Sequence, residues 1–215
     1  MRRSLCLVPI LAIVPAVCPA AAGDGPIPPL SPPVQSGDGG VIPDPVDQPA
    51  EEPVSWSIMG EGSMTADRLV SFLLENNPDA DSGRVALLAS LYVEEAAIEG
   101  VNSDVAFVQM CHETGFLRFG GLVTEEMDNF CGLGSTGPGN PGLWFPDERT
   151  GVRAHIQHLK AYGSTEPLNL EQVDPRFGMV SPRGRSPDIF GLAGTWAADP
   201  QYGQRLADLL ERLCK

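Results

Sequence analysis

The chain has 215 residues and a formal net charge of −14, with 42% apolar and 20% charged residues. This length and composition fit one ordinary domain with an additional terminal segment. The acidic excess, without any dense run of lysine or arginine, excludes a basic nucleic-acid-binding arm, so nucleic acid is not expected as a partner. After residue 22 no stretch approaches the roughly 20 apolar residues that a membrane span requires, and we expect no membrane span.

The first 22 residues have the layout of a secretory signal peptide. Arg2 and Arg3 form a positive start, residues 5–17 form an apolar run, and the alanines at 20–22 suit a cleavage site. The run is short, contains prolines and is not followed by stop-transfer charges, so we predict cleavage and a secreted, periplasmic or cell-envelope location. Acylation of Cys18 in a lipoprotein is the alternative, but a valine stands where a small residue is needed.

Residues 23–53 have the composition of a linker. They include nine prolines, five glycines and six acidic residues, with no lysine, arginine or aromatic residue. Such a segment cannot bury enough apolar surface to offset the entropy of ordering. We therefore predict a disordered spacer that leads into one domain over residues 54–215.

Helical periodicity dominates residues 54–215. Apolar spacing and capping residues predict five helices. The first follows Thr65 and ends at Asn76, the second runs from Arg84 to Glu99, and the third begins at Ser103 and stops at Gly115. The last two cover residues 151–161 and 201–213. The glycine-rich stretch 119–142 favours loops with room for a small hairpin. The expected fold class is α+β, mostly α-helical, with a small irregular or β lobe.

Three cysteines remain after removal of the signal peptide: Cys111, Cys131 and Cys214. In an oxidising compartment Cys111 and Cys131 can form a disulfide, which would leave Cys214 unpaired. The alternative is three reduced cysteines packed as small apolar residues. The sequence leaves both alternatives, one disulfide or three reduced cysteines, open.

Glu113 is the candidate for acid catalysis. It ends the third predicted helix directly before a glycine-rich turn, and Phe116, Phe119 and Phe130 are close by in sequence. A carboxyl group among these rings would be partly desolvated, which favours its protonated form and lets it donate a proton to a leaving oxygen. A solvated glutamate at a helix end is the alternative.

The three histidines do not have the spacing of a zinc site. A metalloprotease motif that began at His112 and Glu113 would need its second histidine at position 116, where a phenylalanine stands. His155 and His158 lie three residues apart without a third ligand nearby. We expect packing and hydrogen bonding around the fourth helix instead, with no metal and no other cofactor.

Four motifs follow one another between residues 57 and 213. They are Glu-Thr-Gly at 113–115, Asn-Phe-Cys-Gly-Leu at 129–133, a helix after the Asp-Glu-Arg-Thr-Gly at 147–151, and Ala-Asp-Pro-Gln-Tyr at 198–202. In this order they resemble the bacterial glucosaminidase family, glycoside hydrolase family 73. The resemblance implies a lysozyme-like α+β fold and hydrolysis of the β-1,4 bond after N-acetylglucosamine in peptidoglycan.

Residue roles follow from motif position in this resemblance. It implies that Glu113 is the general acid, that Tyr202 is a tyrosine beside the cleaved sugar, and that Asn129, Phe130 and Gly132 line the glycan groove. A tyrosine suits its position because it can hydrogen-bond an N-acetyl group while its ring stacks on a sugar. A core tyrosine that opens the last helix is the alternative.

Two tryptophans and an arginine cluster are further candidates for contact with glycan. Trp196 lies just before the last motif and is predicted to stack on a sugar, with a core position as its alternative, and Trp144 is a second possible platform. Arg176, Arg183 and Arg185 can meet carboxylates of the wall peptides, or form a solvated loop.

A second carboxylate is harder to assign. Members of the family carry an acid in a hairpin after the general acid, but residues 135–144 contain no aspartate or glutamate. We favour Asp147 over Glu126. Two carboxyls about 5 Å apart would predict retention, whereas about 6.5 to 9.5 Å would predict inversion. Without a second acid, the acetamido group of the substrate is the candidate nucleophile.

The resemblance leaves three functions to compare. The first is a monomeric hydrolase of peptidoglycan glycan strands. The second is a lytic transglycosylase-like enzyme, in which one glutamate acts as acid and base and a sugar hydroxyl closes an anhydro ring. The third is a non-catalytic wall-binding or scaffolding domain that the acidic, proline-rich linker keeps near the envelope. Its support is the poor electrostatic match of an enzyme this acidic to acidic wall polymers, which should repel it.

Overall fold

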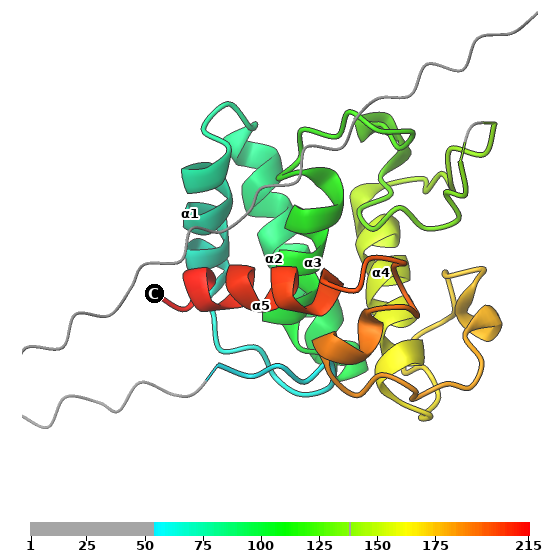
Figure 1. Cartoon of the computed structure of the whole chain (residues 1–215). Helices are drawn as coiled ribbons and strands as arrows, with labels where there is room; N and C mark the ends of the chain where they lie inside the picture. The colour runs from blue at the N-terminus through cyan, green and yellow to red at the C-terminus, as the bar shows by residue number, and fades with distance from the viewer. Residues whose placement is uncertain (1–53, 138) are drawn as a thin grey trace, which may run out of the picture. The chain divides into compact units, whose positions relative to one another are not determined.

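The computed structural model describes residues 54–137 and 139–215 of the chain. The predicted signal peptide (1–22) and linker (23–53) lie outside these residues and stay predictions. Within the described residues the helices are α1 (Ala66–Asn76), α2 (Ser82–Glu99), α3 (Ser103–Thr114), α4 (Glu148–Gly163) and α5 (Tyr202–Leu213) (Figure 1). Three short 3-10 turns, η1 (Glu125–Met127), η2 (Phe177–Met179) and η3 (Ile189–Leu192), lie in the connections.

The fold is mostly helical, as predicted, and its small lobe is irregular. The described residues contain no β-strand, only four isolated bridges, one of which joins Gly137 to Asn140 at the place of the expected hairpin. No helix of the described part is long and apolar enough to cross a membrane. The mostly helical arrangement is consistent with a lysozyme-like fold.

Local capping explains where the helices begin and end. The Thr65 side chain accepts a hydrogen bond from the Arg68 amide at the start of α1, and Asn102 caps α3 in the same way. Gly100 and Gly115 end α2 and α3 in the left-handed conformation, at φ 71° and 60°. These are the caps and stops that local sequence encodes.

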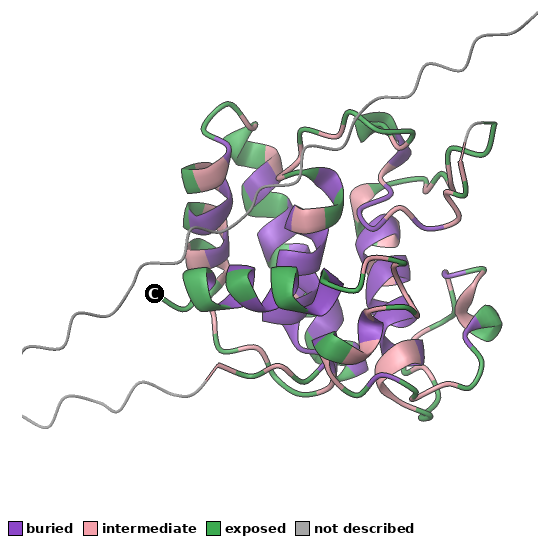
Figure 2. Ribbon diagram, in the orientation of Figure 1, coloured by how far each residue is buried: buried purple, intermediate pink, exposed green. Residues whose placement is uncertain are grey.

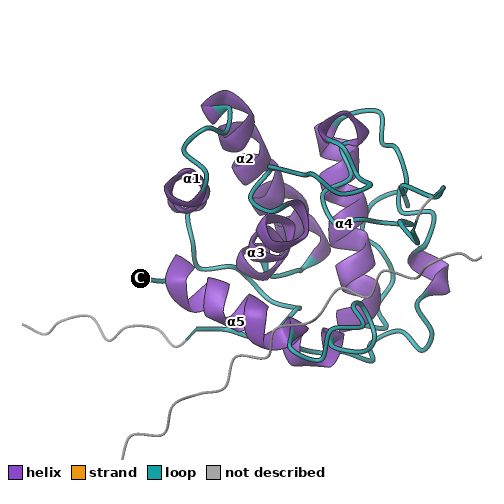
Figure 3. Ribbon diagram, turned by 45° about the horizontal axis from the view of Figure 1, so that its top comes forward, coloured by secondary structure: helices purple, strands orange, loops and turns teal. Residues whose placement is uncertain are grey.

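Helix α3 is the centre of the core. Its residues from Ser103 to Cys111 are all buried, so the helix is apolar or enclosed on every face rather than amphipathic (Figure 2). It lies among α2, α4 and α5 (Figure 3). Glu113, in the last turn of α3, is exposed. Burial of most of the helix fixes the direction in which the Glu113 carboxyl group points.

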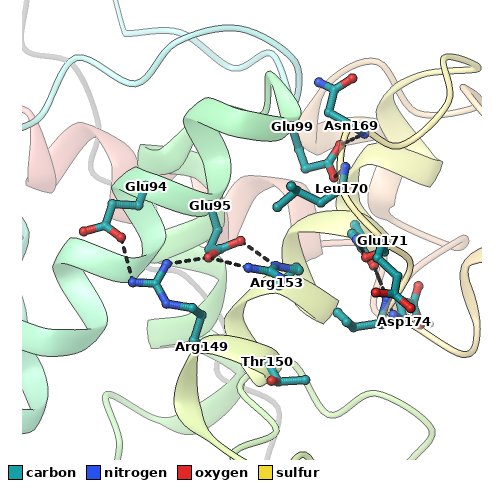
Figure 4. A network of polar contacts seen from close by, with 12 residues as sticks. Glu94, Glu95, Glu99, Arg149, Thr150, Arg153, Asn169, Leu170, Glu171 and Asp174 are labelled. Atoms are coloured by element: carbon teal, nitrogen blue, oxygen red, sulfur yellow. Dashed lines mark hydrogen bonds and ion pairs between the residues drawn. The ribbon is translucent and has the colours of Figure 1, made fainter.

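Ion pairs connect α2 to α4. The fully buried carboxylate of Glu95 accepts hydrogen bonds from Arg149 at 2.7 Å and from Arg153 at 2.7 and 3.1 Å (Figure 4). Burial acts to raise the pKa of Glu95, but the hydrogen bonds and charges of the two arginines outweigh it, and the pKa is lowered. One turn further along α2, Glu99 pairs with Lys160 at 2.8 Å, and both side chains are buried.

A glycine allows α4 to approach the irregular lobe. A Cβ atom at Gly151 would lie 1.9 Å from the carbonyl oxygen of Asp128. Any side chain at this position would therefore push α4 away from the loop that begins at Asn129.

The three cysteines of the described part, Cys111, Cys131 and Cys214, are free thiols. The structure therefore agrees with the reduced alternative and not with a disulfide between Cys111 and Cys131. These two thiols are buried, and burial raises the pKa of each above its ordinary value. The neutral thiol is the favoured form of both, which makes them poor nucleophiles.

Candidate active site

Glu113 opens into a cavity of about 410 Å³. Its walls come from the end of α3 and the following turn (residues 113–123), from the loop 129–135 and from Trp196 with Ala197. Among the described residues of this lining, Glu113 is the only one with a carboxyl group. The structure thus brings together four of the predicted site residues, namely Glu113, Asn129, Gly132 and Trp196.

The side chain of Glu113 is exposed to this cavity, so the predicted desolvation among phenylalanine rings is wrong for the free protein. Phe116 and Phe119 are only half-buried, and Phe130 is enclosed in the core. Only a substrate bound in the cavity would shield the Glu113 carboxyl group from water.

One oxygen of the Glu113 carboxyl group is held by two neutral donors. The indole nitrogen of Trp196 donates to Oε1 at 3.1 Å, and the hydroxyl of Tyr202 donates to the same oxygen. The other oxygen, Oε2, lies 3.9 Å from the position that a Cβ atom at Gly132 would occupy. Oε2 therefore lies on the Gly132 side of an exposed residue that lines the cavity. Burial and the charge of Glu113 raise the pKa of Tyr202 well above its ordinary value, so the phenol keeps its proton.

A chain of hydrogen bonds runs from Tyr202 into the core. Gln109 Nε2 donates to the Tyr202 oxygen at 2.8 Å, Gln109 Oε1 lies 3.0 Å from His155 Nε2, and His155 Nδ1 lies 2.8 Å from the Tyr92 hydroxyl. Burial lowers the pKa of His155 to about 3, so the ring is neutral.

The donors of this chain all point toward Glu113. An ionised Glu113 only accepts, so Tyr202 donates to it and must accept from the Gln109 amide nitrogen. The Gln109 oxygen then accepts from His155 Nε2, and the neutral ring accepts from Tyr92 through Nδ1. We call Tyr92, His155, Gln109 and Tyr202 the donor chain. The sequence signal for it was weak: Gln109 lies one helical turn before Glu113, and only hydrogen bonding in general was expected of His155.

Asp147 does not lie in the cavity. It caps the N-terminus of α4, where its carboxylate accepts the amide and the hydroxyl hydrogen bonds of Thr150 at 2.8 and 2.9 Å. These bonds, the amide first, lower the pKa of Asp147. Glu126 is exposed and also outside the cavity lining. The structure therefore gives neither candidate for the second carboxylate a place beside Glu113.

Two of the predicted groove residues, Asn129 and Phe130, hold the loop or the core together. Asn129 lies in the lining, but its amide group bonds the backbone of Leu133 at 2.8 and 2.9 Å and of Leu143 at 3.0 Å, which ties the two ends of the loop together. Phe130 is fully buried in the core and does not line the cavity. Phe130 therefore lies beneath the cavity, whereas Asn129, Cys131 and Gly132 of the same loop line it.

The turn after α3 has an unusual backbone. Phe116, Leu117 and Phe119 have φ values of 58°, 61° and 54°, which are uncommon for residues other than glycine. The amide of Leu117 donates to the Thr114 hydroxyl at 2.9 Å, and Asn77 donates to the Phe116 carbonyl at 2.7 Å. These bonds stabilise a turn whose backbone the sequence did not predict, and Phe119 at its end lines the cavity near Glu113 as expected.

Metal chemistry finds no support in the side chains of this part of the chain. In residues 54–137 and 139–215 no three histidine, cysteine, aspartate or glutamate side chains are grouped so that they could hold an ion. His158 bonds Asp174 at 2.7 Å through Nδ1, and His155 belongs to the donor chain.

Comparison with known proteins agrees with the motif order. The family described as Glucosaminidase, mannosyl-glycoprotein endo-beta-N-acetylglucosaminidase, matches residues 89–215. An uncharacterized protein of Borreliella burgdorferi is 42% identical over 156 residues, which cover 73% of this chain and 76% of the relative. No solved structure matches the chain. Since the matched region is more than half of the chain and contains the cavity, the donor chain and the Glu113 carboxyl group, the chain belongs to the Glucosaminidase family.

Proposed function

We propose that the chain hydrolyses the β-1,4 glycosidic bond after N-acetylglucosamine in peptidoglycan glycan strands, with Glu113 as the general acid. Membership of the Glucosaminidase family supports glycosidase activity on peptidoglycan in general. The observation that carries the role of Glu113 is its position as the only carboxyl group among the described residues of the cavity lining. We also propose that the first 22 residues direct export, since the substrate lies outside the cytoplasm.

The two oxygens of Glu113 have different tasks in this proposal. Oε2, on the side of Gly132, carries the proton and passes it to the glycosidic oxygen as the bond to the sugar breaks. Oε1 remains with Tyr202 and Trp196, whose hydrogen bonds stabilise the carboxylate charge that this transfer creates. The same two bonds fix the orientation of the acid before the substrate arrives.

The group that completes the reaction separates two chemistries. In the hydrolytic reaction, water or the acetamido oxygen of the substrate attacks the sugar carbon. The presence of a single carboxyl group in the described lining also favours a second candidate, a lytic transglycosylase-like cleavage in which Glu113 takes back a proton from a sugar hydroxyl. That reaction yields anhydro-muramyl ends, whereas hydrolysis yields reducing ends.

Mass spectrometry of the soluble products from purified sacculi tests the proposal. We expect the wild-type protein to release fragments with reducing N-acetylglucosamine, and Glu113→Gln to lower the rate by about 100-fold or more. The matched control is Glu61→Gln, because Glu61 is exposed and outside the cavity lining, and it should retain the wild-type rate.

Three results would count against the proposed function. Anhydro-muramyl products would favour the transglycosylase reaction. Sedimentation of the wild-type protein with sacculi without any product would favour a wall-binding domain. An undiminished rate in Glu113→Gln would remove the assigned acid.

A further inference from the structure

A second cavity continues the one at Glu113. It has a volume of about 240 Å³ and shares Cys131, Gly132, Ser135 and Trp196 with the first cavity. Its lining also includes Arg176, from the segment between α4 and η2. Because the two cavities share these four residues, a polymer bound at Glu113 can extend past Trp196 into the cavity that Arg176 lines.

Arg176 differs from the other arginines of the described residues. It is the only one whose guanidinium group makes no hydrogen bond or ion pair within that part of the chain; the others bond carboxylates, backbone carbonyls or amide oxygens. Its side chain is nevertheless half-buried in the cavity wall. A partly enclosed cation with all of its donors free is prepared to bind an anion from the cavity.

The carboxylate two residues before Arg176 already has hydrogen-bond partners. Asp174 is buried, and its Oδ1 accepts the backbone amide of Arg176 at 2.7 Å, while Oδ2 is bonded to His158 Nδ1 at 2.7 Å. These bonds fix the backbone from which Arg176 extends. Among the described residues, no aspartate or glutamate lines this second cavity. Within the described residues no carboxylate therefore pairs with the Arg176 guanidinium, although the chain as a whole has a net charge of −14.

The pKa of Tyr162, another residue of this lining, agrees with the position of the Arg176 charge at the second cavity. Burial raises the pKa of Tyr162, and the charges of Arg185 and Arg176 act against the rise. The Tyr162 hydroxyl donates its proton to the Thr195 carbonyl at 3.0 Å. This proton is therefore already used and leaves Arg176 as the donor for an anion in the cavity.

We propose that the second cavity is a subsite for a carboxylate-bearing substituent of the sugar next to the cleaved bond, and that Arg176 binds this carboxylate. The inference rests on the proposed function and deepens it: within peptidoglycan, the subsite would recognise the free carboxylates that distinguish this glycan from a neutral polymer of acetamido sugars. A planar guanidinium can bind a carboxylate through two parallel hydrogen bonds, which gives geometric selection as well as attraction.

The test compares sacculi before and after their carboxyl groups are converted to amides with a carbodiimide and ammonium. Both forms contain the same glycosidic bonds. We expect the wild-type protein to cleave native sacculi about tenfold faster than amidated ones, in line with the strength of charge-assisted hydrogen bonds. Arg176→Gln should reduce cleavage of native sacculi to the amidated rate and leave the amidated rate within twofold, whereas Arg176→Lys should recover part of the preference.

Arg185→Gln is the matched control, because Arg185 is exposed and does not line the second cavity. It should keep the preference for native sacculi. An equal loss of preference in Arg185→Gln would indicate a general effect of basic charge, and a preference that survives Arg176→Gln would overturn the subsite. A slower rate of Arg176→Gln on both forms of sacculi would also overturn it.

A binding measurement separates this inference from the proposed function. Co-sedimentation of the Glu113→Gln protein with native and amidated sacculi reports the subsite even if the chain cleaves nothing. We expect about tenfold weaker binding to amidated sacculi, and loss of this difference when Arg176→Gln is added to Glu113→Gln. Because the Arg176 guanidinium has no partner in the described residues, the midpoint of thermal unfolding should not change.

Discussion

Glutamates on neighbouring helices of this core have very different partners. On α2, Glu95 and Glu99 are buried and bonded to the cations of α4, and on α3, Glu113 is exposed to a cavity and bonded only to the neutral donors of Tyr202 and Trp196. A buried carboxylate with an arginine or a lysine keeps its charge, as the lowered pKa of Glu95 illustrates. A carboxyl group with neutral donors and one accessible oxygen can exchange a proton without losing a salt bridge. The partners, rather than the residue type, separate a structural acid from a chemical one.

The largest effect that would sharpen this contrast is expected at Glu99. Its carboxylate also accepts the amide hydrogens of Asn169 and Leu170 at 2.9 and 3.1 Å, and Lys160 is only 2% exposed. Glu99→Ala would leave a buried ammonium group without a counterion, and the free energy of unfolding should fall by about 3–5 kcal/mol. Urea denaturation followed by circular dichroism measures this change.

The control for Glu99 is an exposed glutamate of the same helix, α2. Glu94 pairs with Arg149 at 2.8 Å, and its side chain is 53% exposed. Glu94→Ala should therefore cost about 0–1 kcal/mol. If the two variants unfold at the same urea concentration, the buried pair does not stabilise the α2 to α4 contact in the way described.

The next-largest effect on stability is expected at His155, the neutral ring of the donor chain. The pKa of His155 is lowered to about 3 by burial, below the ordinary value of about 6.5 that the unfolded chain would have. Between these two pH values the unfolded chain binds a proton that the folded chain does not. The free energy of unfolding should therefore fall as the pH is lowered from about 6.5 toward 3, by up to about 1.4 kcal/mol per pH unit from this residue.

The difference between wild type and His155→Gln isolates this contribution, because other titrating groups are common to both. Their difference in stability, measured by urea denaturation at several pH values, should shrink as the pH falls through that range. Tyr92→Phe keeps the buried imidazole and removes only the hydroxyl at its Nδ1 atom, so it should retain the wild-type slope. Parallel curves for wild type and His155→Gln would show that the ring is not held neutral.

The fold could be predicted from the sequence because its signals are local. Thr65, Gly100 and Gly115 mark helix ends through their own side chains or their own backbone freedom, and the structure has helix ends at these residues. The contact between Tyr202 and Glu113 joins residues 89 positions apart, and no local rule predicts it. Only the order of the motifs indicated that these two residues share a site.

Asp147 shows how a helix boundary bears on the choice of a candidate residue. The fourth helix was expected from residue 151, but α4 begins at Glu148 and Asp147 is its N-cap. An aspartate before a glutamate and three residues before Thr150 has the pattern of an N-cap. The burial of Phe130 could not be predicted from a local pattern. It depends on the close contact between α4, at Gly151, and the loop that holds Phe130.

The smallest effect is expected at Asp147, and it decides whether Glu113 acts with a second carboxylate from the protein. Asparagine caps a helix about as well as aspartate, so Asp147→Asn should keep its stability within about 0.5 kcal/mol and its rate on sacculi within twofold. Asp147→Ala should lose about 1 kcal/mol of stability with the cap, and its rate should also be unchanged. A fall of about 100-fold in Asp147→Asn, with stability intact, would mean that α4 or its preceding loop moves to bring this carboxylate to the substrate. An unchanged rate would leave water or the acetamido group of the sugar as the partner of Glu113, because no other carboxyl group of the described residues lines the cavity.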